Sequence, residues 1–322
     1  MKLRYLALAA APLLWTAGAA AQPAPAMTVQ QYDALLAAVS NAGRWGAEDT
    51  RGTLNHITPE SRVIAAGQVR TGRTVSLSRL LEPGEVPGAL EPMSVVPFAL
   101  DEGGIHWEAE RLGLVFHGYA FSHVDALSHA AFRGRSYNGP ARPGTARGTH
   151  GVETMKDGIV TRGVLVDLPR LRGVEYLEPG TVFAPADVEA WEKSTGVTIG
   201  AGDVVLVRTG RWARQQALGP VDPTKTQAGP HPTMAEWLHR RRVALVGDDG
   251  ANDRAPSVVP GVSHPFHMLA LVAMGMPLLD NMDLDALAAE CAEAKRWTFL
   301  FVGSPLRIKD ATGSPLNAVA VF

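Results

Sequence analysis

Residues 185–208 read PADVEAWEKSTGVTIGAGDVVLVR, and this stretch decides the fold class. Its first part, Pro185–Lys193, has the pattern of a helix. Its last part, Asp203–Arg208, is a short apolar run bounded by glycine and is typical of a buried strand. A helix followed at once by a buried strand predicts that helices and strands are interspersed, as in an α/β protein.

The same interspersed pattern continues on both sides of this stretch. Helices are expected after Thr28 and after Thr58, and also at 267–274, at 283–294 and after Thr233, where Glu236 completes a capping box. Further strands are expected at 74–78, 95–100, 112–117, 163–167, 243–247, 297–302 and 318–322. No repeat of 20 to 50 residues occurs. We therefore predict one compact, β-rich α/β domain over residues 27–322.

The overall composition excludes some classes of function. The chain has 322 residues, of which 46% are hydrophobic and 19% charged, so it can bury a large core. Its formal net charge is −2, so it has no basic excess with which to neutralise phosphates. We expect a small-molecule substrate and no nucleic-acid partner.

The N-terminus has the features of an export signal. Lys2 and Arg4 precede an apolar run at 5–15, and small alanines at 19–21 suit a cleavage site. The apolar run is shorter than the roughly 20 residues of a membrane span. We predict a signal peptide at 1–21, a spacer at 22–26, and a periplasmic or secreted protein that is free of the membrane after cleavage. The single cysteine, Cys291, allows no intramolecular disulfide.

The strongest chemical signal is the sequence SHVDALSH at 122–129. In an extended strand His123 and Asp125 project to the same side, where they can share one divalent metal ion. His129 then suits a base that takes a proton from water whose pKa the metal has lowered. A structural role for these histidines is the alternative, and spacing by itself leaves both open.

A second cluster follows about 140 residues later. His264 and His267 flank Pro265 and Phe266, and Asp280 lies a short helix further on. Because one short segment rarely completes a metal site, His267 and Asp280 are the candidate remote ligands. The alternative is that both residues have only structural roles, His264 as a loop histidine and Asp280 as a turn carboxylate.

These residues carry a resemblance to the cyclase family, which includes bacterial kynurenine formamidases and isatin hydrolase. SHVDALSH matches the second half of the family motif HxGTHxDxPxH. Similar segments lie along nearly the whole mature chain, at 45–46, 52–55, 162–167, 202–210, 275–277, 280–281 and 313–317. The resemblance implies a swivelling β/β/α fold of the kynurenine formamidase type, a metal-dependent amide hydrolase, and a homo-oligomer.

The resemblance also assigns roles to individual residues. It implies that His123, Asp125, His267 and Asp280 are metal ligands and that His129 activates water. Tyr119 stands where the family has the first histidine of its motif, and the sequence leaves open whether Tyr119 or His117 replaces it. Leu127 replaces the motif proline, and Asp280 stands where many members have glutamate. These departures indicate a divergent branch with one divalent ion, zinc or manganese.

The predicted reaction is cleavage of a C–N bond in a formamide or cyclic amide by metal-activated water. A metal-dependent lactone or ester hydrolase needs the same groups and is one alternative. A non-catalytic small-molecule-binding protein on the same fold is another, against which the presence of His129 argues. A serine hydrolase is disfavoured because no Gly-x-Ser-x-Gly elbow occurs.

Overall fold

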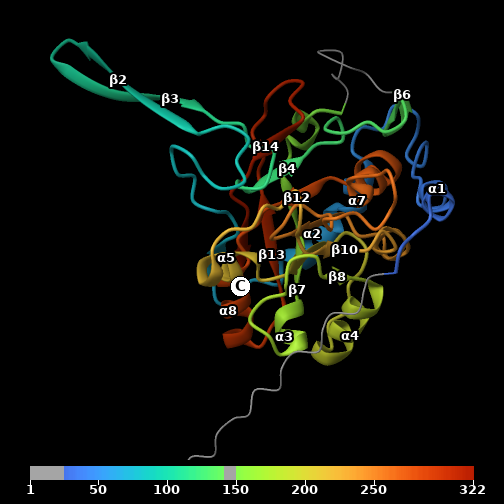
Figure 1. Cartoon of the computed structure of the whole chain (residues 1–322). Coiled ribbons are helices and arrows are strands. Elements are labelled where there is room, and N and C mark those ends of the chain that lie inside the picture. The colour runs from blue at the N-terminus through green and yellow to red at the C-terminus, as the bar shows by residue number, and fades with distance from the viewer. Residues whose placement is uncertain (1–24, 141–149) are drawn as a thin grey trace, which may run out of the picture.

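A nine-stranded mixed sheet organises the molecule (Figure 1). The computed structural model describes residues 25–140 and 150–322, so the predicted signal peptide at 1–21 lies outside the described residues. The strand order is β1-β15-β13-β7-β9-β11-β12-β4-β14. These strands span Thr74–Ser76 (β1), His123–Asp125 (β4), Ile159–Asp167 (β7), Val204–Arg208 (β9), Leu245–Asp248 (β11), Leu278–Asp280 (β12), Thr298–Gly303 (β13), Gly313–Pro315 (β14) and Val319–Val321 (β15).

The four central strands form the buried part of the sheet. Strands β7, β9, β11 and β12 run parallel, whereas the pairs toward both edges are antiparallel. Their apolar runs are covered on both sides, as parallel strands require. Toward one edge, β12 pairs with β4 and β4 pairs with β14, so the motif at 123–125 is held between two neighbours.

The helices lie around this sheet, and several of them, including α2, α4 and α8, contact β7. They span Val29–Ala38 (α1), Pro59–Ala66 (α2), Leu168–Arg172 (α3), Pro185–Thr195 (α4), Arg211–Leu218 (α5), Met234–Arg241 (α6), Pro265–His267 (α7) and Asp285–Ala294 (α8), with 3₁₀ turns at Gly52–His56 (η1) and Val152–Met155 (η3) and a π-helical segment at Met268–Met274 (η4). None of the helices in the described ranges is long and apolar enough to cross a bilayer.

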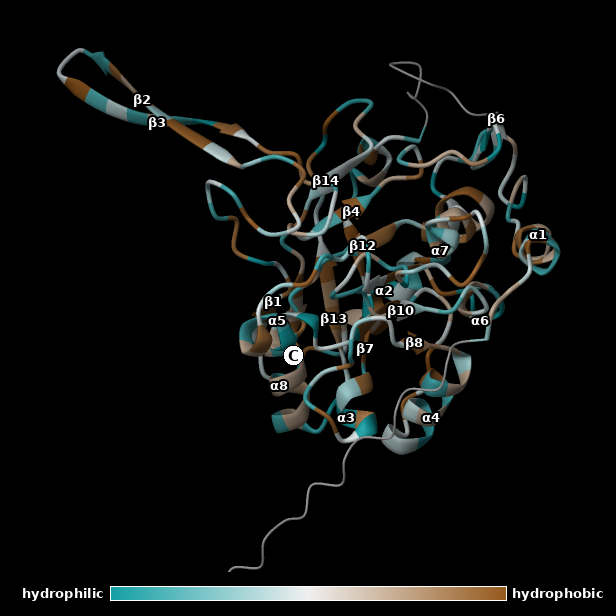
Figure 2. Cartoon of the chain, viewed as in Figure 1, coloured by the Kyte–Doolittle hydropathy of each residue, from teal (hydrophilic) through white to brown (hydrophobic). Residues whose placement is uncertain are grey.

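A long hairpin leaves the body of the molecule next to β4. It consists of β2 (Ser94–Glu102) and β3 (Ile105–Gly113), paired in full antiparallel register and projecting away from the sheet (Figure 1). Figure 2 shows apolar and polar residues alternating along it. Two short two-stranded sheets complete the fold, β5 (Arg135–Ser136) with β6 (Gly139–Pro140) and β8 (Val182–Phe183) with β10 (Gly229–Pro230).

Most of the predicted elements are confirmed, including the α/β fold class and the helices that begin after Thr28 and after Thr58. The strand expected at 112–117 is wrong in its extent, because β3 ends at Gly113 and the next residues turn back toward the sheet. The capping box at Thr233 is also wrong. Its hydroxyl group pairs with the Nδ1 atom of His231 at 2.8 Å and makes no capping bond to α6.

Candidate metal centre

The short strand β4 carries the centre of the site. Because side chains alternate along a strand, Val124 packs into the core while His123 and Asp125 project together to the other side. The register places His123 opposite Asp280 of β12. The pairing of two distant segments in one sheet therefore brings the first cluster next to the second.

Asp125 is the point on which the imidazoles converge. Its Oδ1 atom lies 3.3 Å from Nε2 of His123 and 3.0 Å from Nδ1 of His117. Its Oδ2 atom lies 3.6 Å from Nε2 of His267 and 3.8 Å from Nε2 of His129. One buried carboxylate is thus surrounded by four imidazole nitrogens.

Asp280 completes the cluster from β12. Its Oδ2 atom lies 3.4 Å from Nε2 of His267 and 4.0 Å from Nε2 of His123. Its Oδ1 atom accepts a hydrogen bond of 2.6 Å from Asn252, which leaves Oδ2 facing the histidines. Within the described ranges, two groups have the spacing of a metal site: His117, His123 and Asp125, and Asp125, His267 and Asp280. Asp125 belongs to both.

The histidine tautomers are set by outward hydrogen bonds. His123 donates from Nδ1 to the carbonyl oxygen of Phe121 at 2.8 Å, so its Nε2 faces the cluster as a lone-pair donor. His267 donates from Nδ1 to Oδ2 of Asp253 at 2.7 Å, so Nε2 is the nitrogen that it directs toward the cluster. Asp253 is itself fixed by the backbone N–H groups of Phe266 and His267.

The state of Asp125 fits a bound cation. The residue is fully buried, yet neither carboxylate oxygen has a hydrogen-bond partner among the described residues. Burial alone raises the pKa of Asp125, but His129, His117, His123 and His267 outweigh this and hold it well below its usual range. A buried carboxylate without hydrogen bonds is costly unless a cation neutralises it. Imidazole and carboxylate donors at these spacings suit a divalent metal ion.

His129 occupies a different position from the candidate ligands. Its ring stacks on His117 with centroids 3.9 Å apart, and its side chain is 31% exposed to the cavity described below. Burial, only partly offset by Asp125, lowers the pKa of His129 to about 4. The imidazole is therefore neutral at pH 7 and able to accept a proton.

His117 joins the cluster and Tyr119 does not. A loop after β3 carries His117 inward, where its Nε2 pairs with Thr312 at 2.9 Å and its Nδ1 faces Asp125. The hydroxyl group of Tyr119 instead lies 3.3 Å from Nε2 of His264. In this geometry His117, rather than Tyr119, lies against Asp125.

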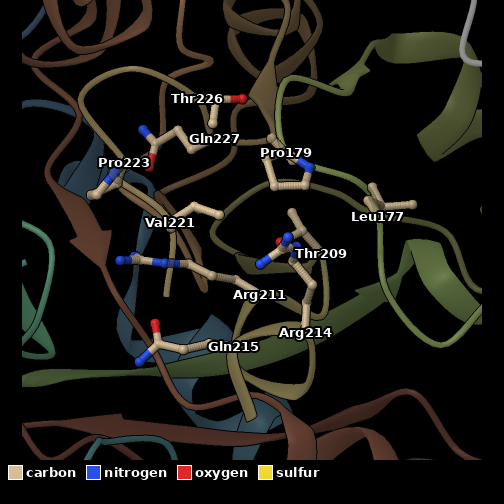
Figure 3. A pocket seen from close by; sticks show the side chains of 12 residues that line it. Leu177, Pro179, Thr209, Arg211, Arg214, Gln215, Val221, Pro223, Thr226 and Gln227 are labelled. Carbon is tan, nitrogen blue, oxygen red and sulfur yellow. The ribbon is translucent and has the colours of Figure 1, made fainter. Parts of the chain in front are cut away.

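The cluster opens into a cavity of about 440 Å³, a volume suited to a small molecule. Its wall includes His117, His123, Asp125, His129, His267 and Asp280, together with Leu90, Tyr119 and Met268. A second pocket, between α5 and the loop at 220–227, holds only about 30 Å³, which is room for about two water molecules (Figure 3). Of these two pockets, only the one beside the histidines has room for a small molecule.

Two polar residues to which the motifs assigned no role hold the wall of this cavity. Arg211, at the start of α5, donates to Oδ1 of Asn281 at 2.7 Å and to the carbonyl oxygen of Tyr119 at 2.6 Å. Asn281 donates in turn to the carbonyl oxygens of Gly118 and Phe121. The carbonyl oxygen of Phe121 also accepts the hydrogen bond from His123. The network therefore fixes the imidazole of His123 through the backbone of Phe121.

Asp253 was also missed, although the sequence contains a signal for it. Asp248 is the last residue of the buried strand β11, and Asp249 and Asp253 follow within five residues. Side chains at the carboxyl ends of parallel strands gather at one edge of the sheet, where α/β proteins build their sites.

Comparison with known proteins identifies the family. The Cyclase family model matches residues 75–252, more than half of the chain, and the chain belongs to this family. A solved structure described as a novel cyclase is 29% identical, with a TM-score of 0.78, and the match covers 88% of this chain and 100% of that one. No curated protein sequence matches the chain.

Two isatin hydrolases share the fold. Isatin hydrolase A from Ralstonia solanacearum is 22% identical with a TM-score of 0.55, over 83% of this chain and 98% of that one. Isatin hydrolase A from Labrenzia aggregata, bound to benzyl benzoate, is 22% identical with a TM-score of 0.57, over 82% and 98%. The resemblance to the cyclase family and the predicted fold are thereby confirmed.

Proposed function

We propose that this protein is a metal-dependent hydrolase that cleaves a C–N bond in a small formamide or cyclic amide. The observation that carries the proposal is the buried Asp125, whose two oxygens have no hydrogen-bond partner in the described part of the chain and face four imidazole nitrogens. Burial of such a carboxylate destabilises the fold, whereas a bound cation would neutralise its charge. The cavity beside it provides room for a substrate.

One zinc or manganese ion is the proposed cofactor, with His123, Asp125, His267 and Asp280 as its ligands. Charge balance supports one ion, because Asp125 and Asp280 together neutralise one divalent cation. A second divalent ion would leave excess positive charge in a buried site. When bound, such an ion polarises a carbonyl group and lowers the pKa of water.

His129 is the proposed general base. It is neutral at pH 7, borders the cavity, and lies next to Asp125 with 31% of its side chain exposed. In the reaction, the water oxygen bonds to the carbonyl carbon as His129 accepts its proton. The C–N bond then breaks, and His129 returns the proton to the leaving nitrogen.

Support for an amide substrate comes from the isatin hydrolases that share the fold, since the name of those proteins specifies a cyclic amide. A lactone or other ester could use the same groups. The test is to assay purified, metal-loaded protein on an N-formyl aromatic amine, isatin and an aromatic lactone. Faster metal-dependent turnover of the amides supports the proposal, and hydrolysis of the lactone alone would contradict it.

We also propose that the chain forms a homo-oligomer through the β2–β3 hairpin. Val96, Phe98 and Leu100 on β2 share one face with Trp107 and Ile105 on β3, and all five are 45–58% exposed. Together with the same face of a second copy, they would bury roughly 1,000 Å², about the lower bound for a specific interface. The opposite face carries Asp101, His106 and Glu108 in a polar cluster and suits solvent.

Export to the periplasm or the medium remains a proposal that rests on residues 1–21 of the sequence. A mature N-terminus at Gln22, read by mass spectrometry of the protein from its native host, would support it.

A further inference from the structure

We propose that a cleft next to the metal cavity binds an uncharged, apolar group of the substrate. The cleft has a volume of about 430 Å³ and lies between the segment at 87–90 and the loop at 220–224. It adjoins the metal cavity, because Leu90 and Tyr119 line both. The inference rests on the proposed hydrolase function and specifies the class of substrate.

The walls of the cleft are predominantly apolar. Pro87, Ala89 and Leu90 form one side, and Pro220, Val221 and Pro223 form the other. Leu90 is 63% exposed and Val221 is 38% exposed. Large apolar side chains that gather uncovered around a concave surface mark a binding site more often than chance exposure does.

No free charge faces this cleft among its described lining residues. Its only carboxylate belongs to Asp222, which accepts hydrogen bonds from the backbone and hydroxyl groups of Thr224 and pairs with Lys225 at 3.2 Å. The carboxylate is thus engaged within its own turn. A charged substituent would lose its water here without gaining a partner, so the cleft selects a neutral group.

Several features restrict the backbone around the cleft. Its three prolines have fixed φ angles, and the N–H group of Tyr119 donates to the carbonyl oxygen of Gly88 at 3.0 Å. Gly88 has a φ of +90°, and a Cβ atom there would lie only 3.1 Å from Tyr119. The segment at 87–90 therefore packs directly on the wall of the metal cavity, and binding costs little ordering of the chain.

Tyr119 lines both the cleft and the metal cavity. Arg211 donates to its carbonyl oxygen and His264 lies beside its hydroxyl group, and these contacts hold the residue in place. The 220–224 loop also lines the small pocket in which Figure 3 shows Val221 and Arg211. A substrate that spans both cavities places its amide at the metal centre and an aryl or alkyl substituent in the cleft.

The test compares formanilide, its 4-butyl derivative and its 4-carboxy derivative. For the wild-type protein we expect kcat/KM to rise about tenfold from formanilide to the butyl compound, since burial of methylene groups is favourable. We expect it to fall by at least as much for the carboxy compound. Equal or better turnover of the carboxy compound would overturn the inference.

Binding without turnover separates this inference from the proposed function. Titration calorimetry with 4-butylaniline, which is not hydrolysed, should show affinity at least fivefold weaker for Leu90→Asn, while Leu80→Asn matches the wild type because Leu80 is 81% exposed outside the cleft. Val221→Asn against the exposed Val174→Asn provides a second matched pair. Unchanged affinity in both cleft variants refutes the cleft. Binding in the cleft without amide hydrolysis refutes only the proposed function.

Discussion

Replacing Asp253 by asparagine should weaken metal binding without removing any proposed ligand. Asp253 accepts three hydrogen bonds, from the backbone N–H of Phe266 at 2.8 Å, from that of His267 at 3.0 Å and from Nδ1 of His267 at 2.7 Å. The asparagine amide has one acceptor oxygen. If that oxygen stays on His267, the NH₂ group faces the N–H group of Phe266, and one hydrogen bond becomes a contact between two donors.

The expected size follows from the role of this contact in orienting His267. Loss of an outer partner of a ligating histidine typically reduces metal affinity by about 10- to 100-fold. The lost negative charge also lowers the basicity of the ring, in the same direction. We therefore expect the metal Kd of Asp253→Asn to rise by about 30-fold, or about 2 kcal/mol.

The assay is competition for zinc with a fluorescent chelator, accompanied by a thermal melt of each protein. Asp33→Asn is the matched control, since that carboxylate is 44% exposed and pairs with Arg133 on the surface. Its affinity should equal that of the wild type. A folded Asp253→Asn protein whose Kd stays within twofold of the wild-type value would refute the reasoning.

Three further predictions follow from the same geometry. His129→Ala should keep one metal ion per chain by elemental analysis and lose at least about 100-fold in kcat, as loss of a general base does; full turnover would remove His129 from the mechanism. Metal affinity should rise with pH, because protons compete with the metal for His267 at low pH. Burial alone lowers the pKa of His267, but Asp280, Asp125 and Asp253 outweigh burial and raise this pKa well above its usual value. An affinity that is flat between pH 5 and pH 8 would count against this competition. Trp107→Gln should shift the protein toward monomer in light scattering after gel filtration, whereas Glu108→Gln on the opposite hairpin face should not; a monomeric wild-type protein would end the oligomer proposal.

The sequence predicted the fold and the placement of His123 and Asp125 on one side of a strand, because both follow from local patterns. Alternation along β4 placed His123 and Asp125 on the same side, and the apolar runs identified the central strands. It also placed His267 and Asp280 in the second cluster, and the structure brings both beside Asp125. Their role as metal ligands remains a prediction.

The remaining parts of the site depend on contacts between distant segments. His117 reaches Asp125 only because the chain turns after Gly113, where the sequence had suggested a continuing strand. The role of Asp253 depends on its hydrogen bonds to α7, and that of Arg211 depends on its hydrogen bond to Asn281, 70 residues away. No local pattern encodes these individual contacts, although the position of Asp253 shortly after β11 places it at the edge of the sheet where the site lies.

The protein's metal content tests the central proposal most directly. Elemental analysis of the purified protein, after dialysis against zinc or manganese and then against metal-free buffer, should give one ion per chain. The Asp125→Asn variant, folded by circular dichroism, should then retain less than about a tenth of that content, since Asp125 belongs to both candidate groups. A wild-type protein without metal, or an Asp125→Asn variant that keeps its ion, would contradict the proposal.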